Sequence, residues 1–434
     1  HLESQKKGVG IMKKLGFNKQ LLALLIFFII QLTAFFVITF RPISITPPGH
    51  TYLFTAKSYM YPIFLYPNHI LQAKNGAWGI KDTHTTQPQG RTYSVWFFVL
   101  AGKLSNLFHL EPVQMFILLQ LSGGIAVFIA TYIFIRTLLP PKYQMPAIFF
   151  SLMFEISPLS LTSLTPVLPG FITPLRNFGL PHHAWGEALG LLSLLFLIRK
   201  NGIGLFISTL LSTVFLPPVM ITLGLSVYPV LFIWALWKKN VKKTIPLLCV
   251  SGFAVIIVGL QTKLAFSAAG YPWSAWSLIE KSWWKSSDAV YLYAQSLTLY
   301  IPFFILLAIT SLYRWKSWPE SVKIIVLVLS SWVVMPLLYI PISDRNFFPV
   351  ANMRLLHGDL YIAAGILSAI ALIEFLSLFK NRTIRQGGFA IVIGLSLGIS
   401  TVLGVSYFTS FLKTQEPIDP HAYPLTSTWE GVKF

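Results

Sequence analysis

Two histidines, an arginine and a glutamate occur within one short stretch that could hold a phosphate group. The stretch runs from Arg176 to Glu187, and His182 and His183 follow directly after Pro181. Because proline is favoured at the first helical position, we expect both histidines in the first turn of a helix. Free backbone N–H groups and nearby cations at a helix N-terminus favour a bound phosphate. Glu187 follows His183 at i,i+4 on one helix face. Helix capping or interfacial packing is the structural alternative.

Carboxylates that could act as a general base are few, because the chain has only 14 Asp+Glu residues. A general base must be a carboxylate or an imidazole within reach of the proton that it takes. The segment from Arg41 to Lys81 contains no acid, so Asp82 is the first candidate, and a solvated loop acid is its alternative. Glu155 and Glu187 are the other candidates. Glu155 ends a short apolar run, where a buried proton-coupling acid and an ordinary interfacial acid are both open.

Aromatic and basic residues near other predicted helix ends could bind the rest of a substrate. Four tryptophans lie between Tyr271 and Lys285, among them Trp273 and Trp276. An aromatic belt at the membrane surface is one interpretation, and a platform for a sugar ring or a polyprenyl chain is the other. Arg354 precedes an apolar run at a position where ionisable side chains are costly unless they are paired or functional. We expect Arg354 either to have a functional role or to pair with Asp359 or with a lipid headgroup.

The sequence predicts no metal centre. Cys249 is the single cysteine and lies in an apolar run, so a cysteine-based metal cluster and an intramolecular disulfide are both excluded. His182 and His183 are adjacent and point apart on a helix, and no His-x-x-x-His spacing occurs. No cofactor is required, although a divalent cation that assists at the site is left open.

The elements that position these residues are predicted to be membrane helices. The chain of 434 residues is 55% hydrophobic and 11% charged, against about 25% charged in soluble domains, which excludes a large soluble enzyme. A run of roughly 20 apolar residues crosses the hydrocarbon core. About eleven such runs (10–12) predict an all-α, polytopic integral membrane protein with long external loops that carry interfacial helices. The predicted spans are 21–40, 113–135, 143–157, 184–198, 203–216, 218–236, 245–262, 293–312, 322–341, 359–378 and 387–410.

The basic residues predict the orientation of these spans. The segment from Tyr93 to Phe108 is apolar but short, so we expect an interfacial helix there and not a further span. With eleven spans, the inner segments hold 19 of the 33 Lys+Arg and 3 of the 14 acids. This asymmetry follows the positive-inside rule and predicts a cytoplasmic N-terminus and an external C-terminal end in the plasma membrane. The net charge of +19 is therefore explained by the basic residues of the inner loops, and it does not indicate nucleic acid as a partner.

The domain organisation follows from the spans. Residues 1–19 form a cytoplasmic basic tail, and residues 20–410 form a single transmembrane domain whose first external loop is 41–112. Residues 411–434 form an external tail that stops without a settled ending, so a fragment with another span beyond it is left open.

The arrangement resembles the GT-C superfamily of polyprenol-phosphate-dependent glycosyltransferases, which includes protein mannosyltransferases and the aminoarabinose transferases of lipid A. An inner N-terminus, one span, a long first external loop and then further spans carry the resemblance. The similar local strings are Gln72 to Trp78, Pro181-His182-His183, Pro272-Trp273 with Glu280, and Arg354 before a span. In one respect the chain departs from the family, because GT-C enzymes usually carry an acid soon after the first span.

The resemblance implies transfer of a sugar from a polyprenyl-phosphate donor to an unidentified acceptor on the outer face. Asp82 would be the base, with Glu187 or Glu155 as substitutes. Arg176, His182, His183 and Arg354 would hold the donor phosphate, and Trp273 and Trp276 would contact the rest of the substrate. The alternatives are a transporter or flippase of lipid-linked sugars, and a non-catalytic membrane protein on a GT-C scaffold.

Overall fold

The protein is a helical bundle. The computed structural model describes residues 60–82, 88–152, 180–275, 278, 285–343, 355–357 and 359–413, together with 22, 24–30, 32–33, 35–36, 40 and 48. The helices are α2 (Met60–Lys74), α3 (Trp96–Leu107), α4 (Pro112–Leu138), α5 (Pro141–Leu152), α7 (Pro181–Arg199), α8 (Gly202–Phe215), α9 (Pro217–Trp237), α10 (Val241–Ala269), α12 (Ser286–Ser296), α13 (Ile301–Arg314), α14 (Glu320–Val334), α15 (Pro336–Ser343), α16 (Asp359–Leu376) and α17 (Arg382–Lys413). Short 3₁₀ turns are η3 (Trp273–Ala275), η4 (Thr298–Tyr300) and η5 (Trp315–Ser317).

The predicted all-α class is confirmed for this part of the chain. Its β-structure is limited to an isolated antiparallel bridge between Ile80 and Thr92. The predicted basic tail at 1–19 and most of the external tail at 411–434 lie outside the described residues. Of the predicted span at 21–40, residues 22, 24–30, 32–33, 35–36 and 40 are described, and they are helical.

Six helical segments among the described residues are long and apolar enough to cross a membrane, which confirms the predicted membrane protein. These segments are Pro112–Leu138, Pro217–Trp237, Val241–Ala269, Thr298–Ser317, Glu320–Ser343 and Asp359–Leu376. The 14-residue helix α8 is also apolar but shorter.

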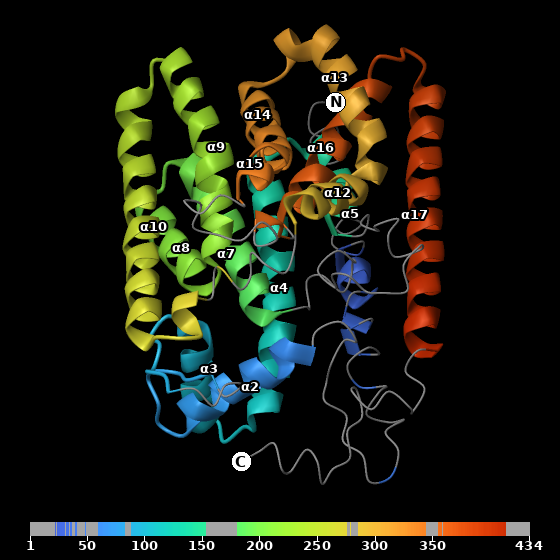
Figure 1. Cartoon of the computed structure of the whole chain (residues 1–434). Helices are drawn as coiled ribbons and strands as arrows, with labels where there is room; N and C mark the ends of the chain where they lie inside the picture. The colour runs from blue at the N-terminus through green and yellow to red at the C-terminus, as the bar shows by residue number, and fades with distance from the viewer. Residues whose placement is uncertain are drawn as a thin grey trace, which may run out of the picture.

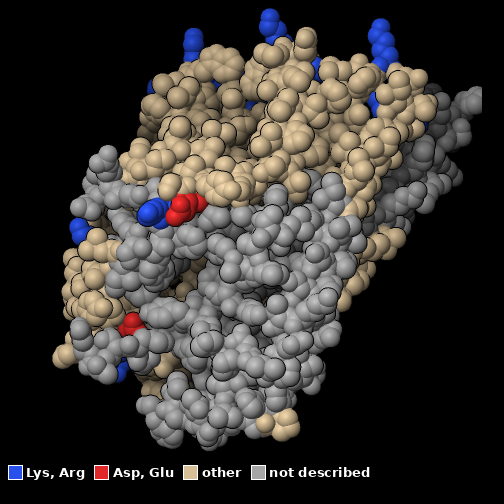
Figure 2. All heavy atoms as spheres, turned by 45° about the vertical axis from the view of Figure 1, so that its right-hand side comes forward, with Lys and Arg blue, Asp and Glu red and all other residues tan. Residues whose placement is uncertain are grey.

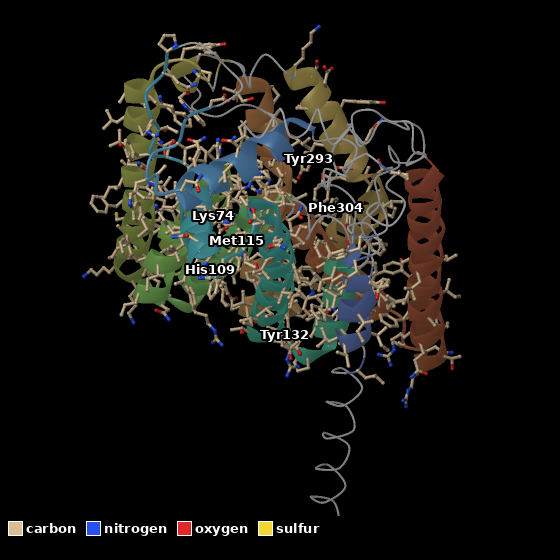
Figure 3. All side chains as sticks on the ribbon, turned by 90° about the horizontal axis from the view of Figure 1, so that it is seen from below. Lys74, His109, Met115, Tyr132, Tyr293 and Phe304 are labelled. Atoms are coloured by element: carbon tan, nitrogen blue, oxygen red, sulfur yellow. The ribbon has the colours of Figure 1, made fainter. Side chains whose placement is uncertain are left out.

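Two helices lie at one end of the bundle, apart from the long ones. Helix α2 runs across the bundle axis and packs on α3, near the start of α4 (Figure 1). Figure 3 looks onto this end, with Lys74 of α2 and Met115 of α4 labelled. Lys74, the last residue of α2, forms an ion pair at 3.4 Å with Glu111, which directly precedes α4. An ion pair therefore also joins α2 to the start of α4. With 12 residues, α3 is too short to cross a bilayer, in agreement with the short helix predicted at 93–108.

Prolines begin several of the helices. Pro112, Pro141, Pro181, Pro217 and Pro336 are the first residues of α4, α5, α7, α9 and α15. Proline suits this position because its fixed φ is helical and its missing N–H group would have no partner there. The connection between α8 and α9 is one residue long, because Pro217 begins the new helix directly after Leu216. This short connection brings the first residues of α9 next to α7.

Helix α16 forms the centre of the bundle, because most of its side chains are buried among other helices. It packs along α5, where Gly365 lies so close that an added Cβ would be 2.5 Å from the carbonyl oxygen of Phe150. Helices α13 and α14 pack on its other sides. This central helix carries a buried carboxylate at each end, Asp359 and Glu374.

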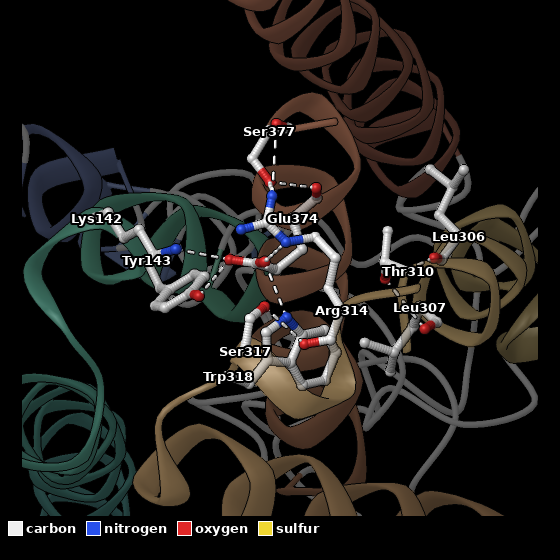
Figure 4. Close-up of polar contacts among 10 residues, drawn as sticks. All are labelled: Lys142, Tyr143, Leu306, Leu307, Thr310, Arg314, Ser317, Trp318, Glu374 and Ser377. Carbon is white, nitrogen blue, oxygen red and sulfur yellow. Dashed lines mark hydrogen bonds and ion pairs between the residues drawn. The ribbon is translucent and has the colours of Figure 1, made fainter. Parts of the chain in front are cut away.

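Glu374 ties three parts of the bundle together (Figure 4). Its carboxylate accepts hydrogen bonds from Lys142 at 2.6 Å, from Tyr143 at 2.5 Å and from the Trp318 indole at 2.9 Å. The Arg314 guanidinium lies 3.5 Å away. The α9–α10, α13–α14 and α16–α17 connections share this end of the bundle, which we call the basic end (Figure 1). Lysine and arginine side chains project from it in Figure 2.

Candidate functional site

The first turn of α7 carries the two adjacent histidines. Helix α7 begins at Pro181, and the backbone N–H groups of His183 and Ala184 donate to the Leu180 carbonyl at 3.0 and 3.2 Å. The prediction that Pro181 opens a helix, with His182 and His183 in its first turn, is therefore confirmed. This helix start faces α4 and the helices at the α2–α3 end.

The histidine rings join a cluster of aromatic side chains from four elements. The His182 ring lies 4.9 Å from the Tyr66 ring of α2, 5.1 Å from Phe98 of α3 and 4.5 Å from His183, measured between centroids. The Trp273 ring of η3 reaches the same cluster through His69, 5.9 Å away. We call Tyr66, His69, Phe98, His182, His183 and Trp273 the outer aromatic cluster.

This cluster unites three of the residues predicted from the sequence, His182, His183 and Trp273. Trp273 is buried at 3% exposure, so its side chain packs inside the protein and does not serve as a membrane-surface anchor. His69 and Tyr66 are members that the sequence analysis did not predict. Their signal was the i,i+3 spacing on a segment not recognised as a helix.

A second cluster lies one turn further along α7, and it combines acids with an imidazole. Glu187 is buried at 5% exposure. The His357 ring, just before α16, places Nδ1 2.5 Å from Oδ1 of Asp359 and Nε2 2.9 Å from Oγ1 of Thr222 on α9. All of these side chains are buried. We call Glu187, Thr222, His357 and Asp359 the acid–imidazole cluster.

A glycine allows α7 to approach this cluster. Gly190 follows Glu187 by three residues and therefore shares its helix face. A Cβ added to Gly190 would lie 2.4 Å from Cγ1 of Val219 and 3.6 Å from Oδ2 of Asp359. Within the described residues, this Oδ2 accepts no hydrogen bond. The close contact places Asp359 beside the face of α7 that carries Glu187.

The electrostatics of the cluster favour a charged imidazole. Burial of the ring lowers the pKa of His357, whereas the charge and hydrogen bond of Asp359 raise it. The charge of Glu187 and the backbone carbonyl of Pro218 act in the same direction as Asp359. The net result is a pKa of His357 above its ordinary value.

Asp82 lies in the connection between α2 and α3, and this connection is held firmly. The Asp82 backbone N–H donates to Oε1 of Gln89 at 2.9 Å, and the Gln89 amide donates to the Asp82 carbonyl at 2.5 Å. Gly90 donates from its backbone to the Ala269 carbonyl at 2.8 Å, which fixes the connection to the end of α10. Asp82 is buried at 3% exposure, so it is not the solvated loop acid of the alternative interpretation.

The remaining predicted site residues lie outside the described residues: Glu155, Arg176, Trp276 and Arg354. Among the residues that are described, no group of three or more His, Cys, Asp or Glu side chains is arranged to hold a metal ion.

His357 and Thr222 belong to the site but were not singled out from the sequence. The sequence signal for His357 is its position two residues before Asp359, at a span that begins with an acid. Thr222 carried no signal, because a threonine inside an apolar run is common and only the fold brings it to the imidazole.

Comparisons of the chain with protein-family models, with curated proteins and with solved structures gave no match.

Proposed function

We propose that the protein is a GT-C-type glycosyltransferase, which transfers a sugar from a polyprenyl-phosphate donor to an acceptor on the outer face of the plasma membrane. The proposal includes about eleven spans, a cytoplasmic N-terminus and the α2–α3 end on the outer side. The supporting observation is the buried carboxylate of Glu187, which lies one turn beyond two histidines at the start of α7. A phosphate-binding helix start and a carboxylate base are thereby adjacent on one helix.

In the proposed reaction, the acceptor hydroxyl oxygen attacks the anomeric carbon of the donor sugar. The bond between that carbon and the phosphate oxygen breaks, and its electron pair remains on the polyprenyl phosphate. Glu187 takes the proton of the attacking hydroxyl. His182, His183 and the positive end of the α7 helix dipole stabilise the charge on the leaving phosphate. The outer aromatic cluster provides rings against which the sugar or the lipid chain packs.

Asp82 is the other candidate for the base, since it is the first acid after the first predicted span. Its buried position supports a role beyond solvation. The two carboxylates are told apart by replacing each with its amide, because an amide keeps the shape but cannot take the proton.

The test measures polyprenyl phosphate release, which requires no knowledge of the acceptor. Membranes that contain the protein are supplied with polyprenyl-phosphate-linked hexoses and pentoses, and the freed polyprenyl phosphate is quantified. We expect release by the native chain and a loss of about 100-fold or more in Glu187→Gln. Normal release in Glu187→Gln with loss in Asp82→Asn would reassign the base to Asp82. No release from any donor by the native chain would overturn the proposed function.

A lipid-linked sugar transporter is the second candidate, and the acid–imidazole cluster favours it specifically. Buried acid and histidine side chains among membrane helices are typical of proton-coupled carriers. Reconstituted vesicles distinguish the two functions: a transporter moves the labelled lipid-linked sugar between leaflets and leaves its sugar–phosphate bond intact. Binding of the donor with neither release nor movement would instead indicate a non-catalytic protein.

A further inference from the structure

The turns that join α7 to α8 and α9 to α10 carry exposed basic residues, which we call the basic corner: Arg199, Lys200, Lys239, Lys242 and Lys243. The sequence contains no acid between Glu187 and Glu280, so neither turn has a carboxylate nearby in the chain. Within the described residues, the side chains of the basic corner form no ion pair.

The acids that the described residues place at the basic end are engaged elsewhere. Glu320, at the start of α14, pairs with Lys238 at 2.8 Å and with Lys323 at 3.2 Å. Glu374 is buried and accepts from Lys142 at 2.6 Å. Neither acid is left to pair with the basic corner, which therefore presents its charge to what lies outside the chain.

The packing of α8 on α10 places the two turns next to each other at different depths. A Cβ added to Gly202, the first residue of α8, would lie 3.6 Å from Cδ2 of Leu247 on α10. Lys243 precedes Leu247 by four residues and shares its helix face. Four residues of helix rise about 6 Å. Lys243 therefore lies about one helical turn beyond Arg199 and Lys200, which leaves room for one phosphate group between cations from both turns.

Outward-facing apolar side chains continue directly from the basic corner. Ile203, in the first turn of α8, is 78% exposed, and Phe206 and Ile207 are also exposed. On α10, Ile245 and Phe253 are exposed in the same way. Both helices are apolar, and α10 is long enough to cross a membrane, so these side chains face lipid chains. Positive charge directly beside an apolar surface matches an amphiphilic anion better than a soluble one.

The place of the lysines in α10 also favours a bound anion. Lys242 and Lys243 lie in the first turn of this helix, where no acid is present. The positive end of the helix dipole disfavours cations there and favours an anion. An anion beside the two lysines therefore interacts favourably with their charges and with the dipole.

We propose that the basic corner binds the phosphate of an anionic phospholipid, whose acyl chains lie along the exposed faces of α8 and α10. Arg199 and Lys200 contact the phosphate from one turn and Lys243 contacts it from the other, while Lys239 and Lys242 add to the positive field. Each basic residue near a membrane surface strengthens the binding of anionic lipid by about fivefold. The inference is independent of the proposed sugar transfer, because it concerns a different part of the molecule and a different ligand.

Thermal unfolding in an uncharged detergent measures the binding, because a ligand of the folded chain raises its unfolding temperature. The native chain is titrated with dioleoylphosphatidylglycerol and, in parallel, with zwitterionic dioleoylphosphatidylcholine. We expect phosphatidylglycerol to act at concentrations at least about tenfold lower. High salt should remove this difference, because it screens the charges. Equal half-maximal concentrations of the two lipids at low salt would overturn the proposal.

A pair of double variants assigns the effect to the basic corner. Lys200→Gln/Lys243→Gln removes one charge from each turn, and Lys81→Gln/Lys263→Gln is the matched control, because it removes two exposed lysines elsewhere, one of them on α10 itself. We expect the half-maximal phosphatidylglycerol concentration to rise at least about fivefold in the first variant and to stay unchanged in the control. An unchanged value in the first variant, or an equal rise in both, would contradict the assignment. Should the first variant not fold, Lys243→Gln alone provides the same comparison.

Two soluble anions test whether the ligand is a lipid. sn-Glycerol 3-phosphate carries a phosphate without acyl chains, and polyglutamate represents an acidic protein segment. We expect neither to raise the unfolding temperature at the concentrations at which phosphatidylglycerol does. An equal rise with sn-glycerol 3-phosphate would show that the apolar faces contribute nothing. A larger rise with polyglutamate would identify an acidic protein as the partner, and either result would overturn the lipid site.

Discussion

The two buried carboxylates of α16, Asp359 and Glu374, have very different surroundings. Asp359 is the first residue of α16, where the helix dipole favours a negative charge, and a single imidazole suffices as its partner. Glu374 lies in the last turns, where the dipole opposes a negative charge. Two cations and two neutral donors surround it there. The second site is therefore built for stability, and the first retains a carboxylate oxygen for which the described residues provide no donor.

Replacing Glu374 with glutamine should destabilise the protein by about 1–3 kcal/mol. Both carboxylate oxygens accept hydrogen bonds, from Lys142 and Tyr143 on one side and from Trp318 on the other. An amide offers one acceptor and turns an N–H group toward donors. Thermal unfolding in detergent measures the loss. Glu320→Gln is the control: its carboxylate pairs with lysines on the surface, where solvent screens the charges, and we expect a much smaller change in stability. Equal effects of the two substitutions would refute this account of Glu374.

The raised pKa of His357 predicts that the native protein loses stability as pH rises. The ring holds its proton more tightly in the folded chain than in the unfolded one. This contribution is complete below about pH 6.5 and is lost as pH rises through the folded pKa. The unfolding temperature should therefore decline above about pH 6.5. The double variant His357→Gln/Asp359→Asn lacks the pair, and parallel curves for it and the native protein would contradict the prediction.

The sequence could predict which site residues lie close together only where those residues are neighbours along one helix. Pro181 and the two histidines were predicted correctly because one helical turn brings them together. The contact between His182 and Tyr66 joins residues far apart in sequence, and so does the bond between His357 and Thr222. No local pattern encodes such pairs, since they depend on how α2, α7, α9 and α16 pack.

At the scale of elements, most helices follow the apolar runs and differ from them at the ends. The predicted span 293–312 is an exception, because it covers the end of α12, the turn η4 and most of α13. The predicted span 245–262 is part of a helix that continues to Ala269. Lys242, Lys243 and Lys263 lie in its extensions, where long basic side chains reach the membrane surface from a continuing helix. Hydropathy detects the apolar core of such a helix and not its polar turns. Helix α2 was missed as an individual element for a related reason, because a helix that lies across the bundle needs no long apolar run.

The close packing of α5 on α16 predicts that no side chain larger than that of glycine fits at position 365. A Cβ there would meet the backbone of Phe150, which cannot rotate away. Gly365→Ala should separate α5 from α16 and cost about 1–3 kcal/mol, although alanine is the better helix former. Thermal unfolding in detergent checks this. Gly259→Ala on α10 is the matched control, because nothing lies within 4 Å of its added Cβ. We expect the control to be neutral or slightly stabilising, and similar losses in both would disprove the packing argument.

At the scale of the whole molecule, the charge distribution and the fold agree. The sequence assigns the α9–α10, α13–α14 and α16–α17 connections to one side of the membrane, and the structure gathers them at the basic end (Figure 1). The assignment was feasible because the positive-inside rule uses loop composition alone. The packing of the helices against one another could not be predicted, because the same spans are compatible with many packings.

Thiol labelling tests the proposed orientation of this end. In a Cys249→Ser background, we introduce Lys380→Cys in the α16–α17 connection or Ser287→Cys near the start of α12, both exposed positions. A membrane-impermeant maleimide should label the Ser287→Cys protein in intact cells. The Lys380→Cys protein should react only after permeabilisation. The reverse pattern would invert the proposed topology.

The buried position of α16 has a consequence for how the protein responds to its lipids. In the membrane-spanning window of α16, 89% of the residues are buried, against 17% in α10. The 18 residues of α16 extend about 27 Å, less than the roughly 30 Å hydrocarbon core, whereas the 29 residues of α10 exceed it. Hydrophobic mismatch acts on helices that touch lipid, so a thicker or thinner bilayer changes the tilt of α10. Helix α16 is shielded from that force, and Asp359 keeps its depth and its partners when the bilayer thickness changes.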